Sequence, residues 1–459
     1  MKLHLNQLAT LFYTSRHHGH TLAFQSRFLL ARDWETKGSR LQRLSTMAPS
    51  STPSTPTRIG VSLDTHTTAY QPRYIDIGIN LADPIFRGRY HGKQRHPDDL
   101  KSVIRRAQEV GCTKLIVTGS SFKSSRDALK LADEFPGTVY TTAGIHPCSS
   151  SIFSVTHKRH HEEDEDHTEE EQHTPACGAD PDKPIPDGLS VSEEKTTKII
   201  KDLEALVKSS PPTSLVAFGE FGLDYDRLHY CPREIQLHSF AAQLQLAASL
   251  KPQLPLFLHS RAAHADFVRL LKEAFGPRLE RLEKGGVVHS FTGTVEEMRE
   301  LMSLGLYIGI NGCSFKTAEN CAVVKEIELD RLMVETDGPW CEVRPSHEGW
   351  KYLLPAKPAA LEVGSVSDPS VTPSHGPDST KQGGKRQGKK NQKKEPEVAD
   401  RFKVVKKEKW EEGAMIKGRN EPCTIERVAK IVAGIKGVSV QEVCEAAWAN
   451  TVKVFGLES

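Results

Sequence analysis

The sequence predicts one α/β domain of the (β/α)8-barrel class. Short apolar, β-branched runs alternate regularly with longer segments whose apolar residues recur at helical spacing. Strands that alternate with helices in this way form right-handed βαβ units and therefore a parallel sheet. Eight strand-like runs are present, which is the number that closes a barrel. About 300 residues remain once three low-complexity stretches are set aside, enough for one such domain.

The predicted elements follow one another along the chain. The expected strands are residues 74–81, 114–118, 139–145, 215–220, 255–259, 286–289, 306–310 and 332–337. The expected helices between them are residues 97–110, 124–134, 193–208, 234–250, 262–274 and 295–304. Two further helices, at 424–433 and 440–454, are expected to complete the barrel after the last low-complexity stretch.

Residues 1–72 are predicted to be a disordered N-terminal extension. They show no sustained apolar period and contain a Ser/Thr/Pro cluster at residues 50–57, a composition that cannot bury a core. No acidic residue precedes Asp33, whereas one Lys and three Arg residues do. This pattern is also typical of a mitochondrial transit peptide. Met47 offers an alternative start that would remove such a signal.

Two charged stretches are predicted to be disordered inserts within the barrel domain, which spans residues 73–456. The first, residues 149–192, contains five histidines and a block at 162–171 in which eight of ten residues are acidic. Like charges at this density favour a solvated loop. The second, residues 355–399, carries seven Lys or Arg residues between 381 and 394. It is interpreted either as a solvated loop or as a phosphate-binding or nuclear-import segment.

Composition excludes several classes of protein. The 61 Lys and Arg residues nearly balance 59 Asp and Glu residues, so the formal net charge is +2, which excludes a wholly basic protein that coats nucleic acid. Nine cysteines without Cys-x-x-Cys spacing argue against a disulfide framework and a zinc ribbon, and they indicate a reducing compartment. No apolar run approaches the roughly 18 residues of a membrane-spanning helix. No membrane association is therefore expected.

Polar residues end four of the predicted strands. In a β/α barrel, the carboxyl ends of the strands meet at one mouth, where the reactive groups gather. The side chains expected to converge there are Glu220, His259, His289 and Asp337. Two imidazoles and two carboxylates suit Mg²⁺, Mn²⁺ or Zn²⁺ without selecting one of them. Each residue alone has a structural explanation, such as a core histidine or a helix cap, but the four together predict a metal site.

These strand ends resemble the TatD family of metal-dependent deoxyribonucleases, and most closely its eukaryotic branch. The most specific matches read AGIHP at residues 143–147 and ETDGPW at residues 335–340. Further matching segments occur in the same order at residues 74–88, 219–228, 255–261, 288–294, 307–314 and 419–422. The resemblance covers about residues 74 to 456 apart from the two inserts.

The resemblance implies a barrel of the metal-dependent hydrolase (amidohydrolase-like) type that cleaves DNA phosphodiester bonds. It assigns the family's metal positions to Glu220, His259, His289 and Asp337. Two divalent ions, Mg²⁺ or Mn²⁺ with Zn²⁺ as an alternative, would stabilise charge on the attacking and leaving oxygens. Glu220 is expected to bridge them, and Asp337 to orient or deprotonate the attacking water. His146 matches a position beside the scissile phosphate.

Three functional hypotheses follow. The leading one is a 3′-5′ exonuclease acting on single strands or frayed ends, since a barrel mouth admits a chain end more readily than a rigid duplex; RNA is a further candidate substrate. Arg261 is expected either to bind the phosphate or to pair with a nearby carboxylate. The alternatives are an amidohydrolase-type enzyme for C–N or ester bonds, and a binding scaffold without activity. The resemblance favours the nucleus or cytoplasm, and no obligate protein partner is inferred.

The first predicted strand departs from the wider amidohydrolase superfamily. Many of those proteins carry a His-x-His pair there, whereas this chain has Asp76, Gly78 and Asn80 at alternate positions. Losing two imidazoles is expected to weaken one metal site and to favour exchangeable Mg²⁺ or Mn²⁺ over tightly held Zn²⁺.

Overall fold

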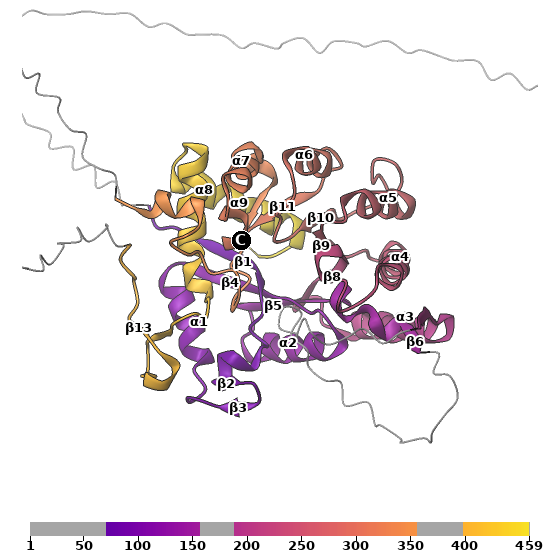
Figure 1. The fold of residues 1–459 in the computed structure, drawn as a ribbon, viewed down its shortest axis with the longest axis horizontal. Coiled ribbons are helices and arrows are strands. Elements are labelled where there is room, and N and C mark those ends of the chain that lie inside the picture. The colour runs from indigo at the N-terminus through magenta and orange to yellow at the C-terminus, as the bar shows by residue number, and fades with distance from the viewer. Residues whose placement is uncertain (1–69, 157–187, 356–397, 459) are drawn as a thin grey trace, which may run out of the picture. The chain divides into compact units, whose positions relative to one another are not determined.

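Parallel strands form the centre of the structure, a computed structural model that describes residues 70–156, 188–355 and 398–458 (Figure 1). The eight-stranded sheet has the order β1-β4-β5-β8-β9-β10-β11-β12. Main-chain hydrogen bonds from Asp337 N to Gly78 O and from Asn80 N to Gly338 O, both 2.8 Å, join the ends of the first and last strands. The sheet is thus a nearly closed barrel, and the predicted (β/α)8 class is confirmed.

The barrel strands agree closely with the predicted ones. They are β1 Tyr74–Ile79, β4 Cys112–Val117, β5 Val139–Ala143, β8 Leu215–Asp224, β9 Leu256–Arg261, β10 Gly286–Val288, β11 Tyr307–Ile310 and β12 Leu332–Val334. The helices outside them are α1 Leu100–Glu109, α2 Phe122–Glu134, α3 Glu193–Ser209, α4 Arg233–Ser249, α5 His264–Phe275, α6 Val295–Ser303, α7 Ala318–Glu326, α8 Ile425–Lys436 and α9 Val440–Phe455.

Apolar side chains that point into the barrel form a separate cluster with the end of α9. The strand members include Ile75, Ile77, Ile116, Phe257, Val287 and Met333, and α9 adds Trp448 and Phe455. Successive side chains of a strand point to opposite faces, so residues two apart share a face. Two positions after Phe257, Val287 and Met333 come His259, His289 and Glu335. These polar side chains therefore lie one layer further along the interior. The mouth of the barrel is therefore polar and its base apolar.

The structure adds elements that the sequence did not predict. α7 was missed because its nine residues bury only Cys321, Val323 and Val324, too few apolar positions for a clear helical period. Short strand pairs also occur, namely β2 Arg89–Tyr90 with β3 Lys93–Gln94, β6 Ser154–Thr156 with β7 Leu189–Val191, and β13 Val404–Val405 with β14 Met415–Ile416.

Parts of the predicted insert at residues 149–192 belong to described elements. Its first residues belong to a 3-10 helix, Pro147–Phe153, and its edges pair as β6 and β7. Burial of Phe153 explains the order on the first side. Residues 157–187, most of the extension at 1–72 and nearly all of the insert at 355–399 lie outside the described residues. Among the described helices, none is both long and apolar enough to cross a membrane.

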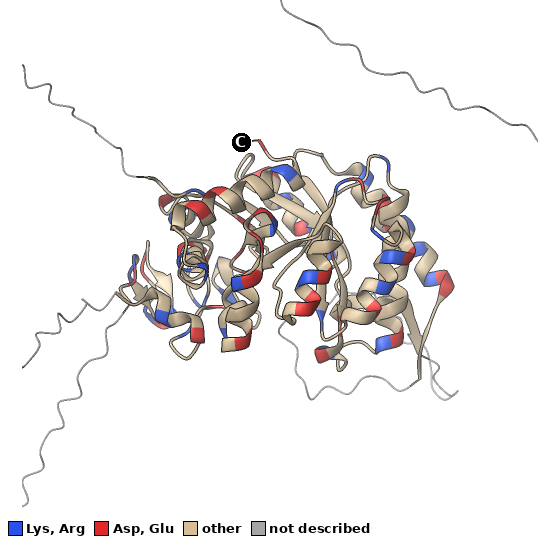
Figure 2. Cartoon of the chain, turned by 90° about the horizontal axis from the view of Figure 1, so that it is seen from above, with Lys and Arg blue, Asp and Glu red and all other residues tan. Residues whose placement is uncertain are grey.

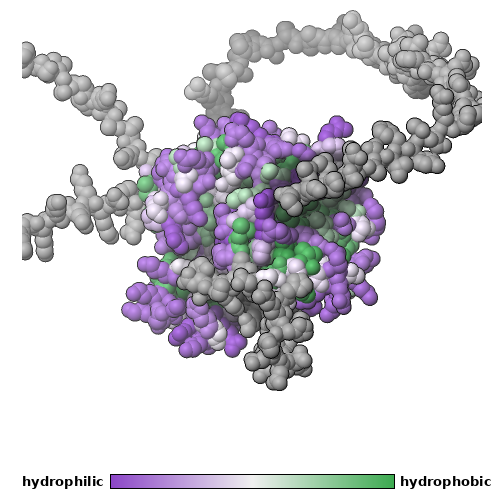
Figure 3. All heavy atoms as spheres, turned by 45° about the vertical axis from the view of Figure 1, so that its right-hand side comes forward, coloured by the Kyte–Doolittle hydropathy of each residue, from purple (hydrophilic) through white to green (hydrophobic). Residues whose placement is uncertain are grey.

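The outer surface is polar and mixed in charge. Figure 2 shows Lys and Arg interspersed with Asp and Glu along the outer helices. The face shown in Figure 3 is mainly hydrophilic, with small apolar patches. No large single-sign field therefore marks the described helices, and the local chemistry of the barrel mouth carries the functional argument.

Candidate metal centre

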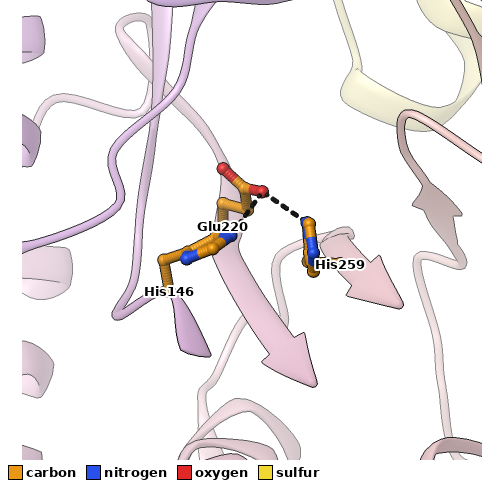
Figure 4. A group of neighbouring side chains, drawn as sticks. All are labelled: His146, Glu220 and His259. Carbon is orange, nitrogen blue, oxygen red and sulfur yellow. Dashed lines mark hydrogen bonds and ion pairs between the residues drawn. The ribbon is translucent and has the colours of Figure 1, made fainter. Parts of the chain in front are cut away.

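Glu220 lies at the centre of a buried polar cluster in the barrel mouth. β8 and β9 pair with a register shift at this residue, and a bulge of this kind re-aims a side chain. The carboxylate points toward His146, which follows β5, and toward His259 on β9 (Figure 4). Glu220 Oε1 lies 2.6 Å from His289 Nε2, 3.0 Å from His259 Nδ1 and 3.4 Å from His146 Nε2.

Three of the predicted ligands therefore converge, and His146 joins them. Ligand atoms of His146, Glu220 and His259 all lie within 4.8 Å of one another. The sequence assigned His146 to the substrate phosphate, but this geometry also makes it a candidate metal ligand. All these residues are at most 6 % exposed, so any cation held between them would be shielded from bulk water.

Asp337 occupies a second position in the mouth, directly after β12. Its Oδ1 accepts a hydrogen bond from Asn80 Nδ2 at 3.1 Å, and its Oδ2 accepts one from Cys341 Sγ at 3.1 Å. It does not belong to the compact group formed by His146, Glu220 and His259. These two donors fix the orientation of the Asp337 carboxylate in the barrel mouth.

Two buried carboxylates support the histidines from behind. Asp224, the last residue of β8, lies 3.1 Å from His259 Nε2. Glu335 lies 3.5 Å from His289 Nδ1 through Oε2, and its Oε1 accepts a 2.5 Å hydrogen bond from Ser290 N. Carboxylates of this kind orient metal-binding imidazoles and raise their basicity. Neither residue was predicted to belong to the site, although Asp224 lies in the matching segment 219–228 and Glu335 in the matching segment 335–340.

The pKa values of the cluster show strong coupling between acids and imidazoles. Burial acts to raise the pKa of Glu220, but the positive charges of His289 and His146 hold it well below its usual value. Burial acts to lower the pKa of His289, yet the carboxylates of Glu220 and Glu335 raise it well above its usual value. Burial raises the pKa of Asp337 to about 6. Burial would also raise the pKa of Asp224, but His259 lowers it to about 2.

This donor set fits a divalent cation. All the ion pairs of Glu220 and Glu335 within the described part of the chain are to histidines. Their positive partner is therefore an imidazole that must keep a proton. His289 Nδ1 and Glu335 Oε2 are buried, and neither has a hydrogen-bond partner among the described residues. A cation beside Glu220 would replace the proton on the facing nitrogen of His289 and use the lone pair of that nitrogen as a ligand.

The first strand shows what replaces the His-x-His pair. The carboxylate of Glu335 fills the space beside Gly78, where an added Cβ would lie 2.4 Å from Glu335 Oε2. Asn80 contributes an amide to Asp337 instead of an imidazole to a metal ion. Asp76 is fully buried and accepts hydrogen bonds from Thr336 and Gly78. This strand therefore supplies support for the mouth, with no imidazole.

A cleft of about 480 Å³ lies beside Asp337, which is the one candidate ligand among the described residues that line it. It is lined by Asp226, Arg227, Arg261, Thr292, Cys313, Lys316, Asn320, Asp337, Trp340 and Cys341. Of the two roles expected for Arg261, pairing with a nearby carboxylate does not occur within 4.0 Å among the described residues. The Arg261 guanidinium and the Lys316 ammonium place positive charge in the cleft, beside the acidic centre.

Comparison with known proteins identifies the family of the chain. The family model described as TatD related DNase matches residues 75–456. The "Deoxyribonuclease Tat-D" of Schizosaccharomyces pombe is 40 % identical over 383 residues, covering 83 % of this chain and 95 % of the relative. The "3'-5' ssDNA/RNA exonuclease TatD" of a Pantoea strain is 34 % identical over 275 residues, covering 59 % of this chain and 82 % of the relative.

A solved structure shows the same architecture. The crystal structure of an "uncharacterized amidohydrolase from Saccharomyces cerevisiae" superposes with a TM-score of 0.61 and 32 % identity, covering 84 % of this chain and 100 % of that one. The predicted family resemblance is confirmed by these matches. The chain belongs to the TatD family of deoxyribonucleases and is a hydrolase that acts on ester bonds.

Proposed function

We propose that this protein is a metal-dependent exonuclease that removes nucleotides from the 3′ end of single-stranded DNA or frayed ends. The observation that carries the proposal is the buried Glu220 carboxylate with three imidazole nitrogens within 3.4 Å of one oxygen. Two divalent ions, Mg²⁺ or Mn²⁺, would supply Lewis-acid stabilisation of the phosphate and lower the pKa of the attacking water. The candidate ligands are His146, Glu220, His259, His289 and Asp337.

The protein's own groups divide the remaining work. Glu220, at the centre of the histidines, would hold the metal together with them. Asp337 is held by Asn80 and Cys341, and its pKa of about 6 suits a group that accepts a proton from water near neutral pH. Arg261 lines the same cleft, where its planar fork would bind a non-bridging phosphate oxygen.

The shape of the cleft favours a chain end. Trp340 lines it beside Arg261 and Lys316, so a base could stack on an indole while the phosphate lies near two cations. A single strand can bend its terminal nucleotide into a mouth that a duplex cannot enter. The printed name of the Pantoea relative, a 3′-5′ exonuclease of ssDNA and RNA, supports the same polarity.

The test is hydrolysis of a DNA oligonucleotide labelled at its 5′ end, with Mg²⁺ or Mn²⁺ added. Wild type should produce a ladder that shortens progressively, whereas EDTA and Glu220→Ala should stop it. An oligonucleotide with a blocked 3′ terminus should resist, which separates a 3′-5′ exonuclease from an endonuclease. Absence of cleavage by folded, metal-loaded protein would overturn the proposal and direct attention to amide and ester substrates.

A further inference from the structure

Two cysteines from separate turns meet in the cleft beside Asp337. Cys313 lies in the 3-10 helix Gly312–Phe315 that follows β11, and Cys341 lies four residues after Asp337. Their sulfur atoms are 2.7 Å apart. Both residues are partly exposed and line the cleft. A dissolved oxidant can therefore reach them.

The backbone holds these two turns in close contact. An added Cβ at Gly312 would lie 1.9 Å from the main-chain oxygen of Cys341, so only glycine permits this approach. Cys341 itself has a positive φ of 53°, a conformation that an L-residue adopts only when its surroundings hold it there. The proximity of the two sulfur atoms is therefore built into the fold of both turns.

The sulfur separation suits a covalent bond better than a shared metal ion. Two thiolates on one tetrahedral Zn²⁺, each about 2.3 Å from it, would lie about 3.8 Å apart. A disulfide needs about 2.05 Å, so a shift of about 0.7 Å from the present 2.7 Å closes it. Among the described cysteines, all are free thiols in the present structure.

We propose that Cys313 and Cys341 form a reversible disulfide that lowers the activity of the neighbouring metal site. In the reduced protein, Cys341 Sγ donates a hydrogen bond to Asp337 Oδ2. A disulfide sulfur has no proton to donate, so oxidation removes one of the two side-chain donors that orient this carboxylate. The other donor, Asn80, contacts only Oδ1. The effect on activity rests on the proposed function, whereas formation of the disulfide does not.

The oxidation step balances with hydrogen peroxide as the oxidant. Cys313 is the better first nucleophile because its contact with Cys341 and the nearby Lys316 lower its pKa to about 7, although burial acts in the opposite direction. The proton of Cys341, by contrast, is donated to Asp337. Its thiolate attacks one peroxide oxygen, which forms S–OH and releases hydroxide. Cys341 sulfur then attacks Cys313 sulfur and displaces the second hydroxide. Overall, two thiols lose two electrons and two protons, and one peroxide becomes two waters.

The experiment compares reduced and peroxide-treated full-length protein. Peptide mapping after alkylation of free thiols identifies linked cysteines, calorimetry measures Mn²⁺ affinity, and a labelled oligonucleotide reports hydrolysis. Cys313→Ser removes the pair, and Cys313→Ala replaces it if the serine variant does not fold. Cys321→Ser is the matched control because this thiol, on α7, does not line the cleft.

In wild type and Cys321→Ser, peroxide should link Cys313 to Cys341. It should also lower both Mn²⁺ affinity and hydrolysis by roughly tenfold, the lower end of the range of 10- to 100-fold for loss of an outer partner of a metal ligand. Dithiothreitol should restore both. Cys313→Ser, compared with its own reduced state, should lose neither. Absence of the linked peptide would overturn the proposal, as would a linked protein with unchanged Mn²⁺ affinity and hydrolysis. If reduced wild type binds Mn²⁺ but leaves DNA intact, the proposed nuclease function fails. Peptide mapping and Mn²⁺ affinity then still show whether the disulfide forms and whether it weakens the metal site.

Discussion

Two buried clusters of charged side chains differ in how their charges are balanced. The arginine cluster consists of Asp99, Arg106, Arg419 and Glu421, all at most 4 % exposed. Arg419 binds Asp99 through two hydrogen bonds of 2.9 and 2.7 Å and donates a third, of 2.8 Å, to Glu421. Arg106 donates a 2.8 Å hydrogen bond to Glu421. Two permanent cations therefore face two carboxylates, and the cluster is neutral by itself.

The metal centre lacks such balance. Three of its buried carboxylates, Glu220, Asp224 and Glu335, contact imidazoles whose charge depends on a proton. Asp224 also lies 3.7 Å from Arg227, and Asp337 is held by the neutral donors of Asn80 and Cys341. The arginine cluster thus needs no further charge, whereas the centre needs protons or a cation.

Asn420 lies between two members of the arginine cluster in the sequence. Its amide donates hydrogen bonds of 2.9 and 2.8 Å to the main-chain oxygens of Thr336 and Trp340. The balanced cluster braces the loop that carries Asp337.

The sharpest test of this difference is Glu220→Gln. It keeps the shape of the side chain but removes the charge that a divalent ion needs. Hydrolysis should fall by at least about 10³-fold, since metal stabilisation of the transition state contributes several kcal/mol. The unfolding free energy, measured with denaturant in EDTA, should fall, because His289 loses a carboxylate that raises its pKa. The fall should be smaller than in the arginine cluster, because an imidazole can release its proton and an arginine cannot. Retained hydrolysis would show that the centre is structural.

Glu421→Gln makes the corresponding change in the arginine cluster. Removing one member of a buried ion pair leaves charge uncompensated, so the unfolding free energy should fall by about 3 kcal/mol or more. Mn²⁺ affinity, measured by calorimetry at a temperature where the variant is folded, should stay near the wild-type value. A stable variant that has lost Mn²⁺ binding would contradict the division of roles between the clusters.

Asp224→Asn tests the support behind His259. The amide cannot replace the carboxylate that lies 3.1 Å from Nε2, so the imidazole loses its anionic partner. Mn²⁺ affinity should fall roughly 10- to 100-fold, the usual cost of removing an outer partner of a metal ligand. The exposed Asp226→Asn is a nearby control, and an equal loss there would point to the general charge of the loop.

The pH dependence of Mn²⁺ affinity distinguishes the titrating groups. His289 has a raised pKa, so binding must displace its proton around neutral pH. Asp337, with a pKa of about 6, adds a second proton to displace once the pH falls below that value. Log affinity should therefore rise with pH, by about one decade per unit near pH 7 and about two below pH 6. Asp224, at about 2, contributes nothing there, and a flat profile would contradict the ligand assignment.

The barrel could be predicted because its signals are local. Strands such as Leu256–Arg261 are β-branched or apolar runs whose ends show in the sequence, and parallel strands bring those ends together in any closed barrel. For this reason the sequence could predict that Glu220, His259 and His289 lie together. That these residues and Asp337 bind metal stays a prediction. α7 was missed because its stability comes from packing against neighbours.

The supporting residues could not be predicted because they depend on how side chains turn. Asp224 reaches His259 only because of the register shift in β8, and Glu335 reaches His289 only because Gly78 leaves space for it. The contact between Cys313 and Cys341 joins turns that are 28 residues apart. No periodicity in the sequence encodes such contacts.

The most direct test of the metal centre is equilibrium binding of Mn²⁺ to protein stripped with EDTA, comparing wild type, Glu220→Gln and Glu421→Gln. The account predicts saturable binding of up to two ions by wild type, strongly weakened binding by Glu220→Gln and retained binding by Glu421→Gln. Equal binding by all three proteins, or no binding by folded wild type, would contradict the assignment of this cluster as a metal site.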